Sequence, residues 1–207
     1  MIPAGGCVGR RIRGVLFDFD GTLTLPGALD FPSIKREMGC PPDIPILEYL
    51  GTLLPGRRDS LSRILESREV EAAERSLPNA GALVCLSALK RKGLLLGILT
   101  RNGMRSVLVA LQKFGGVTAD DFVAIFTREN ALPKPHPDGV YQAAKAMRIS
   151  TDELMVVGDF RFDVMAGKTA GALTVLLTNH KRPAWDPGDP TPDYTVDRLE
   201  DILKFTP

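Results

Sequence analysis

Five short apolar runs separated by helical patterns constrain the fold of this chain more than any other feature. The runs lie at 15–17, 94–99, 122–126, 154–157 and 173–177. Helical patterns lie between them at 80–92, 104–114, 138–148 and 162–170, and a last pair at 194–196 and 199–205 closes the chain. Short, continuously apolar strands are typical of parallel sheets that are buried on both faces. The alternation therefore predicts an α/β fold with a doubly wound, Rossmann-like parallel sheet.

The stretch from 26 to 77 interrupts this alternation. It has no pattern of a buried strand, and it instead predicts helices at 31–38, 44–53 and 59–75, with prolines and glycines between them. We therefore predict a small helical cap domain at 26–77, inserted after the first strand. The α/β core domain would be formed by 1–25 and 78–207. The segment 181–192 holds four prolines and predicts a surface loop.

Charge and cysteine content narrow the class of protein. The 26 basic and 25 acidic residues give a formal net charge of +1, which provides no electrostatic reason to expect nucleic acid or a membrane surface as partner. Cys7, Cys40 and Cys85 have no metal-binding spacing, and three cysteines do not suggest a disulfide framework. No apolar run approaches the length of a bilayer span, and too few residues precede Cys7 for a signal peptide. We therefore expect a cytoplasmic protein.

Polar side chains follow the apolar runs at the points where the strands would end. They are Asp18 and Asp20 after the first run, Thr100, Arg101 and Asn102 after the second, Lys134 in the loop after the third, and Asp159 and Asp163 after the fourth. Open parallel sheets bind ligands at the carboxyl ends of their strands. We therefore expect these side chains to converge at one edge of the sheet.

Four converging carboxylates cannot all stay ionised unless a cation offsets their repulsion. Oxygen ligands without histidine or cysteine favour a hard ion, and Mg²⁺ suits a shell that water and phosphate complete. A metal ion and a lysine together can neutralise a phosphoryl group during its transfer. One carboxylate can then attack phosphorus, while a second, two residues away on the same side of the strand, exchanges protons with the leaving oxygen and with water.

These residues resemble the four motifs of the haloacid dehalogenase-like (HAD) phosphohydrolases. The run Asp18-Phe19-Asp20-Gly21-Thr22-Leu23 resembles the first motif, and Thr100 after an apolar strand resembles the second. Lys134-Pro135-His136-Pro137 resembles the third, and Gly158-Asp159 with Asp163 resembles the fourth. The order and spacing match over nearly the whole chain. The helical insertion resembles the cap of the phosphoglycolate phosphatase-like subfamily.

The resemblance implies a role for each matching residue. Asp18 would be the nucleophile and Asp20 the general acid and base, while Thr100 and Lys134 would hold the phosphoryl oxygens, with Arg101 and Asn102 as further candidates for phosphate contact. Mg²⁺ would be bound by Asp18, the backbone carbonyl of Asp20, Asp159 and Asp163. A carboxylate at position 20 favours phosphate esters over the dehalogenation and phosphonate cleavage of other members. The implied activity is hydrolysis of a small phosphorylated metabolite.

The chain departs from the common patterns of the family in three places. The second motif reads Thr-Arg-Asn, the fourth contains the bulky Phe160-Arg161-Phe162, and the cap is short. The cap also carries a basic cluster of Arg57 and Arg58, with Lys35 and Arg36 elsewhere in it, which is either a solvated face or the source of a contact to a second anionic group of the substrate.

Other functions share part of this pattern. A phosphosugar mutase would use the same core, and a catalytically silent phosphate-binding protein would keep the same residues. Receiver domains also combine acids, threonine and lysine, but they lack the Asp-x-Asp-Gly-Thr motif and the helical cap. Gly167-Lys168-Thr169 imitates the end of a nucleotide P-loop, but Phe162 stands where that loop requires a glycine.

Overall fold

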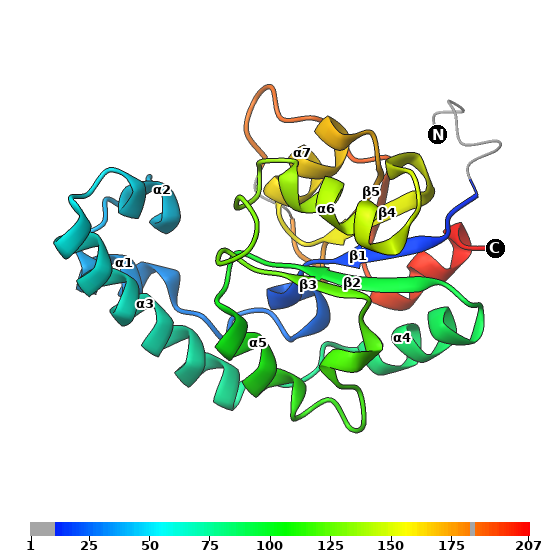
Figure 1. The fold of residues 1–207 in the computed structure, drawn as a ribbon, viewed down its shortest axis with the longest axis horizontal. Helices are drawn as coiled ribbons and strands as arrows, with labels where there is room; N and C mark the ends of the chain where they lie inside the picture. The colour runs from blue at the N-terminus through cyan, green and yellow to red at the C-terminus, as the bar shows by residue number, and fades with distance from the viewer. Residues whose placement is uncertain (1–10, 183–184) are drawn as a thin grey trace.

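Six parallel strands form the centre of the computed structural model, which describes residues 11–182 and 185–207 (Figure 1). In spatial order they are β3 (Ala124–Phe126), β2 (Leu95–Leu99), β1 (Gly14–Phe17), β4 (Leu154–Gly158), β5 (Leu173–Leu177) and β6 (Tyr194–Val196). The sequence order reverses on either side of β1, which is the topological switch point of a doubly wound sheet. The predicted α/β fold is confirmed.

Helices cover both faces of the sheet (Figure 1). The helices α4 (Ala82–Arg91) and α5 (Met104–Leu111) and the 3₁₀ turns at Leu199–Phe205 lie on one face, and α6 (Asp138–Met147) and α7 (Arg161–Ala170) lie on the other. Val15 and Phe17 of β1 pack into the first layer, whereas Leu16 packs into the second. This two-sided burial explains why the strands are continuously apolar rather than alternating.

Several predicted element boundaries differ from the observed ones. The run at 122–126 contributes only three residues to β3, because a 3₁₀ turn at Ala119–Asp121 directly precedes it and is closed by a capping box between Thr118 and Asp121. The helix predicted at 104–114 ends at Leu111, and the one predicted at 80–92 spans Ala82–Arg91. The imitation of a P-loop at 167–169 lies within α7, so it forms no phosphate-binding loop.

Three helices lie between β1 and α4 and pack around an apolar cluster of their own. They are α1 (Phe31–Met38), α2 (Ile46–Gly51) and α3 (Pro55–Arg75). The predicted start of the third helix at 59 was wrong by four residues. Proline fits the first position of a helix, where its missing N–H costs nothing, so Pro55 begins α3 rather than separating it from α2.

The two chain segments that lead into and out of these helices lie side by side. Thr24 and Pro78 form an antiparallel bridge, and the Leu25 N–H donates to the Leu77 carbonyl at 2.9 Å. The predicted cap bounds of 26 and 77 lie just beyond this bridge. The helical insert therefore leaves the core a few residues after β1 and is attached near the carboxyl end of that strand.

Two predictions concern cysteines and membranes. Cys40 and Cys85 are buried free thiols, in agreement with the absence of a disulfide framework between them, and Cys85 lies on the buried face of α4. Cys7 and the segment before it lie outside the described residues. Within the described part of the chain, no helix combines the length and the apolar character needed to cross a bilayer.

The burial of α4 gives a stability prediction. Leu89 is fully buried against the sheet, so Leu89→Ala should lower the free energy of unfolding by about 2–5 kcal/mol through the lost transfer energy and the cavity it leaves. The control is Val84→Ala on the same helix, where the side chain is 64% exposed and the expected change is within about 0.5 kcal/mol. Urea unfolding curves measure both. Equal effects of the two substitutions would contradict the assigned packing of α4.

Candidate active site

The site begins where β1 ends, between β2 and β4. Phe17 lies opposite Ile98 of β2 and Val157 of β4. Asp18 therefore follows β1 at the same edge of the sheet where β2 and β4 end. The following turn requires Gly21, which has a φ of +75°, and a Cβ atom at this position would collide with an Asp159 carboxylate oxygen. The chain after β1 can therefore approach Asp159 closely because position 21 has no side chain.

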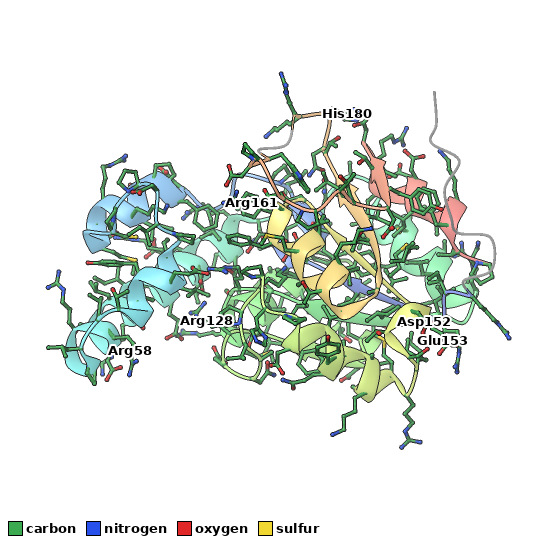
Figure 2. All side chains as sticks on the ribbon, turned by 90° about the horizontal axis from the view of Figure 1, so that it is seen from above. Arg58, Arg128, Asp152, Glu153, Arg161 and His180 are labelled. Atoms are coloured by element: carbon green, nitrogen blue, oxygen red, sulfur yellow. The ribbon has the colours of Figure 1, made fainter. Side chains whose placement is uncertain are left out.

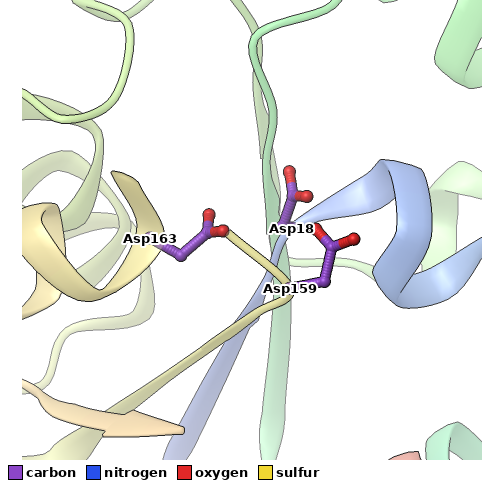
Figure 3. Close-up of side chains that lie close together, drawn as sticks. All are labelled: Asp18, Asp159 and Asp163. Atoms are coloured by element: carbon purple, nitrogen blue, oxygen red, sulfur yellow. The ribbon is translucent and has the colours of Figure 1, made fainter. Parts of the chain in front are cut away.

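Three carboxylates meet at this edge of the sheet (Figure 3). Asp18, Asp159 and Asp163 each offer an oxygen, and these oxygens all lie within 4.8 Å of one another. Asp18 follows β1, Asp159 follows β4, and Asp163 lies in the first turn of α7. An oxygen-only donor set of this kind fits a hard divalent cation such as Mg²⁺.

Lys134 offsets part of this negative charge. Its side chain is 3% exposed, and its Nζ donates to Asp18 Oδ1 at 2.6 Å and to Asp163 Oδ1 at 2.5 Å. Burial by itself would lower the pKa of Lys134, but the charges of Asp163 and Asp18 outweigh it and raise the pKa above its usual value. Lys134 is therefore a fixed positive charge against the carboxylate cluster.

Asp20 lies apart from the three carboxylates and has a different environment. Its side chain accepts a hydrogen bond from the Asn102 amide. Burial, and next the charge of Asp18, raise the pKa of Asp20 to about 7, although the Asn102 hydrogen bond acts in the opposite direction. A carboxyl group with a pKa near neutral can exchange a proton during a reaction at physiological pH.

The residues after β2 point in different directions. Thr100 is buried, and its hydroxyl accepts a hydrogen bond from the Asn102 backbone N–H at 3.2 Å. The Arg101 guanidinium instead reaches toward the helical insert and pairs with both carboxylate oxygens of Glu48 on α2, at 2.9 and 2.6 Å. It also donates to the Lys134 carbonyl and lies 5.0 Å from the centre of the Phe162 ring. Arg101 thus links the insert to the core.

A cavity of about 480 Å³ lies between the helical insert and the core. All eight predicted site residues line it: Asp18, Asp20, Thr100, Arg101, Asn102, Lys134, Asp159 and Asp163. Of the four basic residues considered in the cap, Lys35 lines the cavity, whereas Arg36, Arg57 and Arg58 are exposed outside its lining. Figure 2 shows Arg58 at the end of the insert that is far from the core.

Sequence reasoning missed one buried carboxylate in the cavity wall. Glu69 of α3 is 4% exposed and accepts hydrogen bonds from Arg128 at 2.6 and 2.7 Å and from the Gly103 N–H at 3.1 Å. These contacts fasten α3 to the core near the start of α5. One signal was available, because Leu61, Leu65, Glu69 and Ala73 follow each other at four-residue spacing on the buried face of α3.

The fold and the site together define a doubly wound α/β protein with a carboxylate cluster at its switch point, under a helical insert. The chain belongs to the haloacid dehalogenase-like hydrolases, whose family model matches residues 12–171. The resemblance given by the four motifs is thereby confirmed.

Individual relatives agree with this assignment. The chain is 33% identical over 174 residues to an uncharacterized hydrolase of Saccharomyces cerevisiae, covering 83% of this chain and 79% of the relative. It is 28% identical to a phosphoglycolate phosphatase of Pasteurella multocida, covering 90% of this chain and 95% of the relative. A hydrolase from Pseudomonas syringae has the same fold, with a TM-score of 0.75, 20% identity, and coverage of 93% and 96% of the two chains.

The raised carboxyl pKa values predict how stability depends on pH without metal. Burial is the largest cause that raises the pKa values of Asp159 and Asp163, as it is for Asp20 at about 7. A carboxyl whose pKa is higher in the folded state stabilises the fold below the unfolded pKa, and this stabilisation is lost as the pH rises through the folded pKa. In chelator, the melting temperature should therefore fall as the pH rises through about 7.

Mg²⁺ bound to the ionised carboxylates of the folded protein would reverse this loss. Thermal melts across this pH range, with chelator and with MgCl₂, test the prediction. Asp20→Asn removes one of the titrating groups and should flatten the dependence in chelator. A melting temperature in chelator that rises through neutral pH would contradict it.

The Arg101–Glu48 pair predicts a local effect on α2. Glu48→Gln should speed amide hydrogen exchange in α2 by up to about fivefold, because exposed ion pairs contribute up to about 1 kcal/mol. Glu37→Gln is the matched control, since it breaks the pair of Arg68 with Glu37, which lies wholly within the insert. Equal exchange in both variants would show that the Arg101 contact does not hold α2 against the core.

Proposed function

We propose that this protein is a Mg²⁺-dependent phosphatase that hydrolyses a small phosphate monoester through an aspartyl-phosphate on Asp18. The observation that carries the proposal is the contrast between two carboxyl groups two residues apart. Asp18 lies among acids that could hold a metal ion and accepts a hydrogen bond from Lys134. Asp20 lies outside that group, accepts from Asn102 and has a pKa of about 7. One group is suited to attack phosphorus and the other to exchange protons.

The donor set supports a bound Mg²⁺ held by Asp18, Asp159 and Asp163, with the Asp20 backbone carbonyl as a further ligand. The ion would supply positive charge against the phosphoryl oxygens and hold the phosphate in position. Lys134 would add a second positive charge to the same oxygens. The Thr100 hydroxyl, which is buried in the cavity wall, would donate to another phosphoryl oxygen.

The chemistry then runs in two displacements at phosphorus. In the first, an Asp18 carboxylate oxygen bonds to phosphorus while the ester P–O bond breaks, and Asp20 gives its proton to the leaving alcohol oxygen. In the second, Asp20 takes a proton from water, the water oxygen bonds to phosphorus, and the bond to Asp18 breaks. Inorganic phosphate leaves, Asp18 is again a carboxylate, and Asp20 again carries its proton. Asn102 keeps the Asp20 carboxyl oriented throughout.

The relatives support a phosphatase in particular. The Pasteurella multocida relative is a phosphoglycolate phosphatase and is matched over nearly its whole length. The same core would serve a mutase, which returns the phosphoryl group to a second hydroxyl. In a phosphatase, by contrast, water is the final acceptor of the phosphoryl group.

Phosphate release from a panel of phosphate monoesters, with MgCl₂ or with chelator, tests this function. Asp18→Asn should abolish release, because an amide cannot serve as the nucleophile. Asp20→Asn should lower kcat by about 10²–10⁴-fold, which is the usual contribution of a general acid and base. Asp120→Asn, at an exposed site within the 3₁₀ turn before β3 and outside the cavity lining, should leave the rate unchanged.

Two results would count against the proposal. Isomerisation of a sugar phosphate without phosphate release would indicate a mutase. A folded, Mg²⁺-binding sample that releases no phosphate from any ester would indicate a silent binding protein.

A further inference from the structure

The aromatic residues of the fourth motif have no part in the proposed chemistry, yet they line the cavity. Phe160 and Phe162 pack edge to face, with ring centres 4.9 Å apart. Arg101 and Arg161 lie 5.0 and 5.5 Å from the centre of the Phe162 ring, so cations hold that ring in place. Figure 2 shows Arg161 at the end of α7 that faces the helical insert. The pair forms a firmly supported aromatic surface beside Asp159.

This surface is only partly covered. Phe160 is 42% exposed although it lies in the cavity wall, and Phe31 of α1 and Leu25 also line the cavity at 50% and 41% exposure. Phe160 belongs to the core, whereas Phe31 belongs to the insert, so apolar side chains border the space from both parts. These large apolar side chains are in contact with water beside the proposed phosphate site. A ligand that covers them removes apolar surface from water, which makes its binding more favourable.

The cavity also has little charge to offer a second anionic group. The Arg101 guanidinium is paired with Glu48, and Arg161 is paired with Asp186 and Asp189. Lys134 is held by Asp18 and Asp163. Lys35 is the remaining cation of the lining, and its Nζ donates to the Pro42 carbonyl at 2.7 Å.

The volume agrees with a larger leaving group. A cavity of about 480 Å³ falls in the range of sites for ligands well above the size of a two-carbon phosphate ester. With the phosphate held at the carboxylate edge, most of the space lies against apolar and aromatic walls. A short acidic leaving group would leave these walls in contact with water.

We propose that the substrates are phosphate monoesters whose alcohol part is a planar, apolar group that packs between Phe160 on the core and Phe31 on the insert. This inference rests on the proposed phosphatase function and specifies its substrate class. The aromatic rings select the leaving group, while the carboxylates and Lys134 act on the phosphate.

The test compares kcat/KM for 2-phenylethyl phosphate, ethyl phosphate and phosphoglycolate in MgCl₂. The first two are both primary alkyl esters, so they differ mainly in the ring. Burying a phenyl ring should favour 2-phenylethyl phosphate over ethyl phosphate by about tenfold to a hundredfold. Phe160→Ala and Phe31→Ala should each bring this ratio toward one, mostly through KM, and Phe160→Trp should keep it high. Leu108→Ala, at an exposed apolar site on α5 outside the cavity, should not change the ratio.

The outcomes separate the two proposals. Phosphate release with a ratio near one in the native protein would overturn the aromatic inference and leave the phosphatase intact. A preference for phosphoglycolate that Lys35→Met abolishes would also overturn it, since Lys35 would then bind a substrate carboxylate. No release from any of the three esters or from the wider panel would instead count against the phosphatase function. Because Phe31 is remote in sequence from the carboxylate cluster, Phe31→Ala tests the ring contact without altering a neighbour of Asp159.

Discussion

Repulsion among closely spaced carboxylates at the carboxyl ends of β1 and β4 is the constraint on which the rest of the site depends. Asp18, Asp159 and Asp163 lie too close together to stay ionised without positive charge. Lys134 supplies part of that charge through its contacts with Asp18 and Asp163, and the donor set suits a divalent cation for the remainder. Asp20 has no such contact with Lys134 and instead accepts from Asn102, so the same burial gives it a pKa suited to proton transfer.

The helical insert is held over these charges by contacts of different kinds. The Thr24–Pro78 bridge brings its two connections together, and the buried Glu69–Arg128 pair fastens α3 to the core. The Arg101–Glu48 pair fastens α2 and is more exposed, so it is the weaker of the two fastenings. The ion pairs therefore hold the insert to the core more firmly at α3 than at α2.

The walls of the resulting cavity differ in their chemical character. Charge is concentrated at the sheet edge, whereas the surfaces contributed by the insert and by Phe160 are largely apolar. In a family whose members share one core chemistry, the alcohol part of the substrate must be recognised by residues outside that core. Here the proposed contacts are Phe31 of α1 and Phe160 in the turn between β4 and α7, which folding brings to one cavity.

The sequence alone determined the strands, their parallel arrangement and the convergence of the site residues. Apolar runs mark buried strands, and parallel strands carry the residues that follow them to one edge, so Asp18, Thr100 and Asp159 had to meet. It could not show that Glu69, on the buried face of α3, meets Arg128 and the Gly103 N–H of the core. Nor could it show that Arg101 turns to Glu48 while Arg57 and Arg58 stay exposed. Strand ends follow from local pattern, but the position of a cap depends on long-range packing and ion pairs, which only the tertiary structure decides.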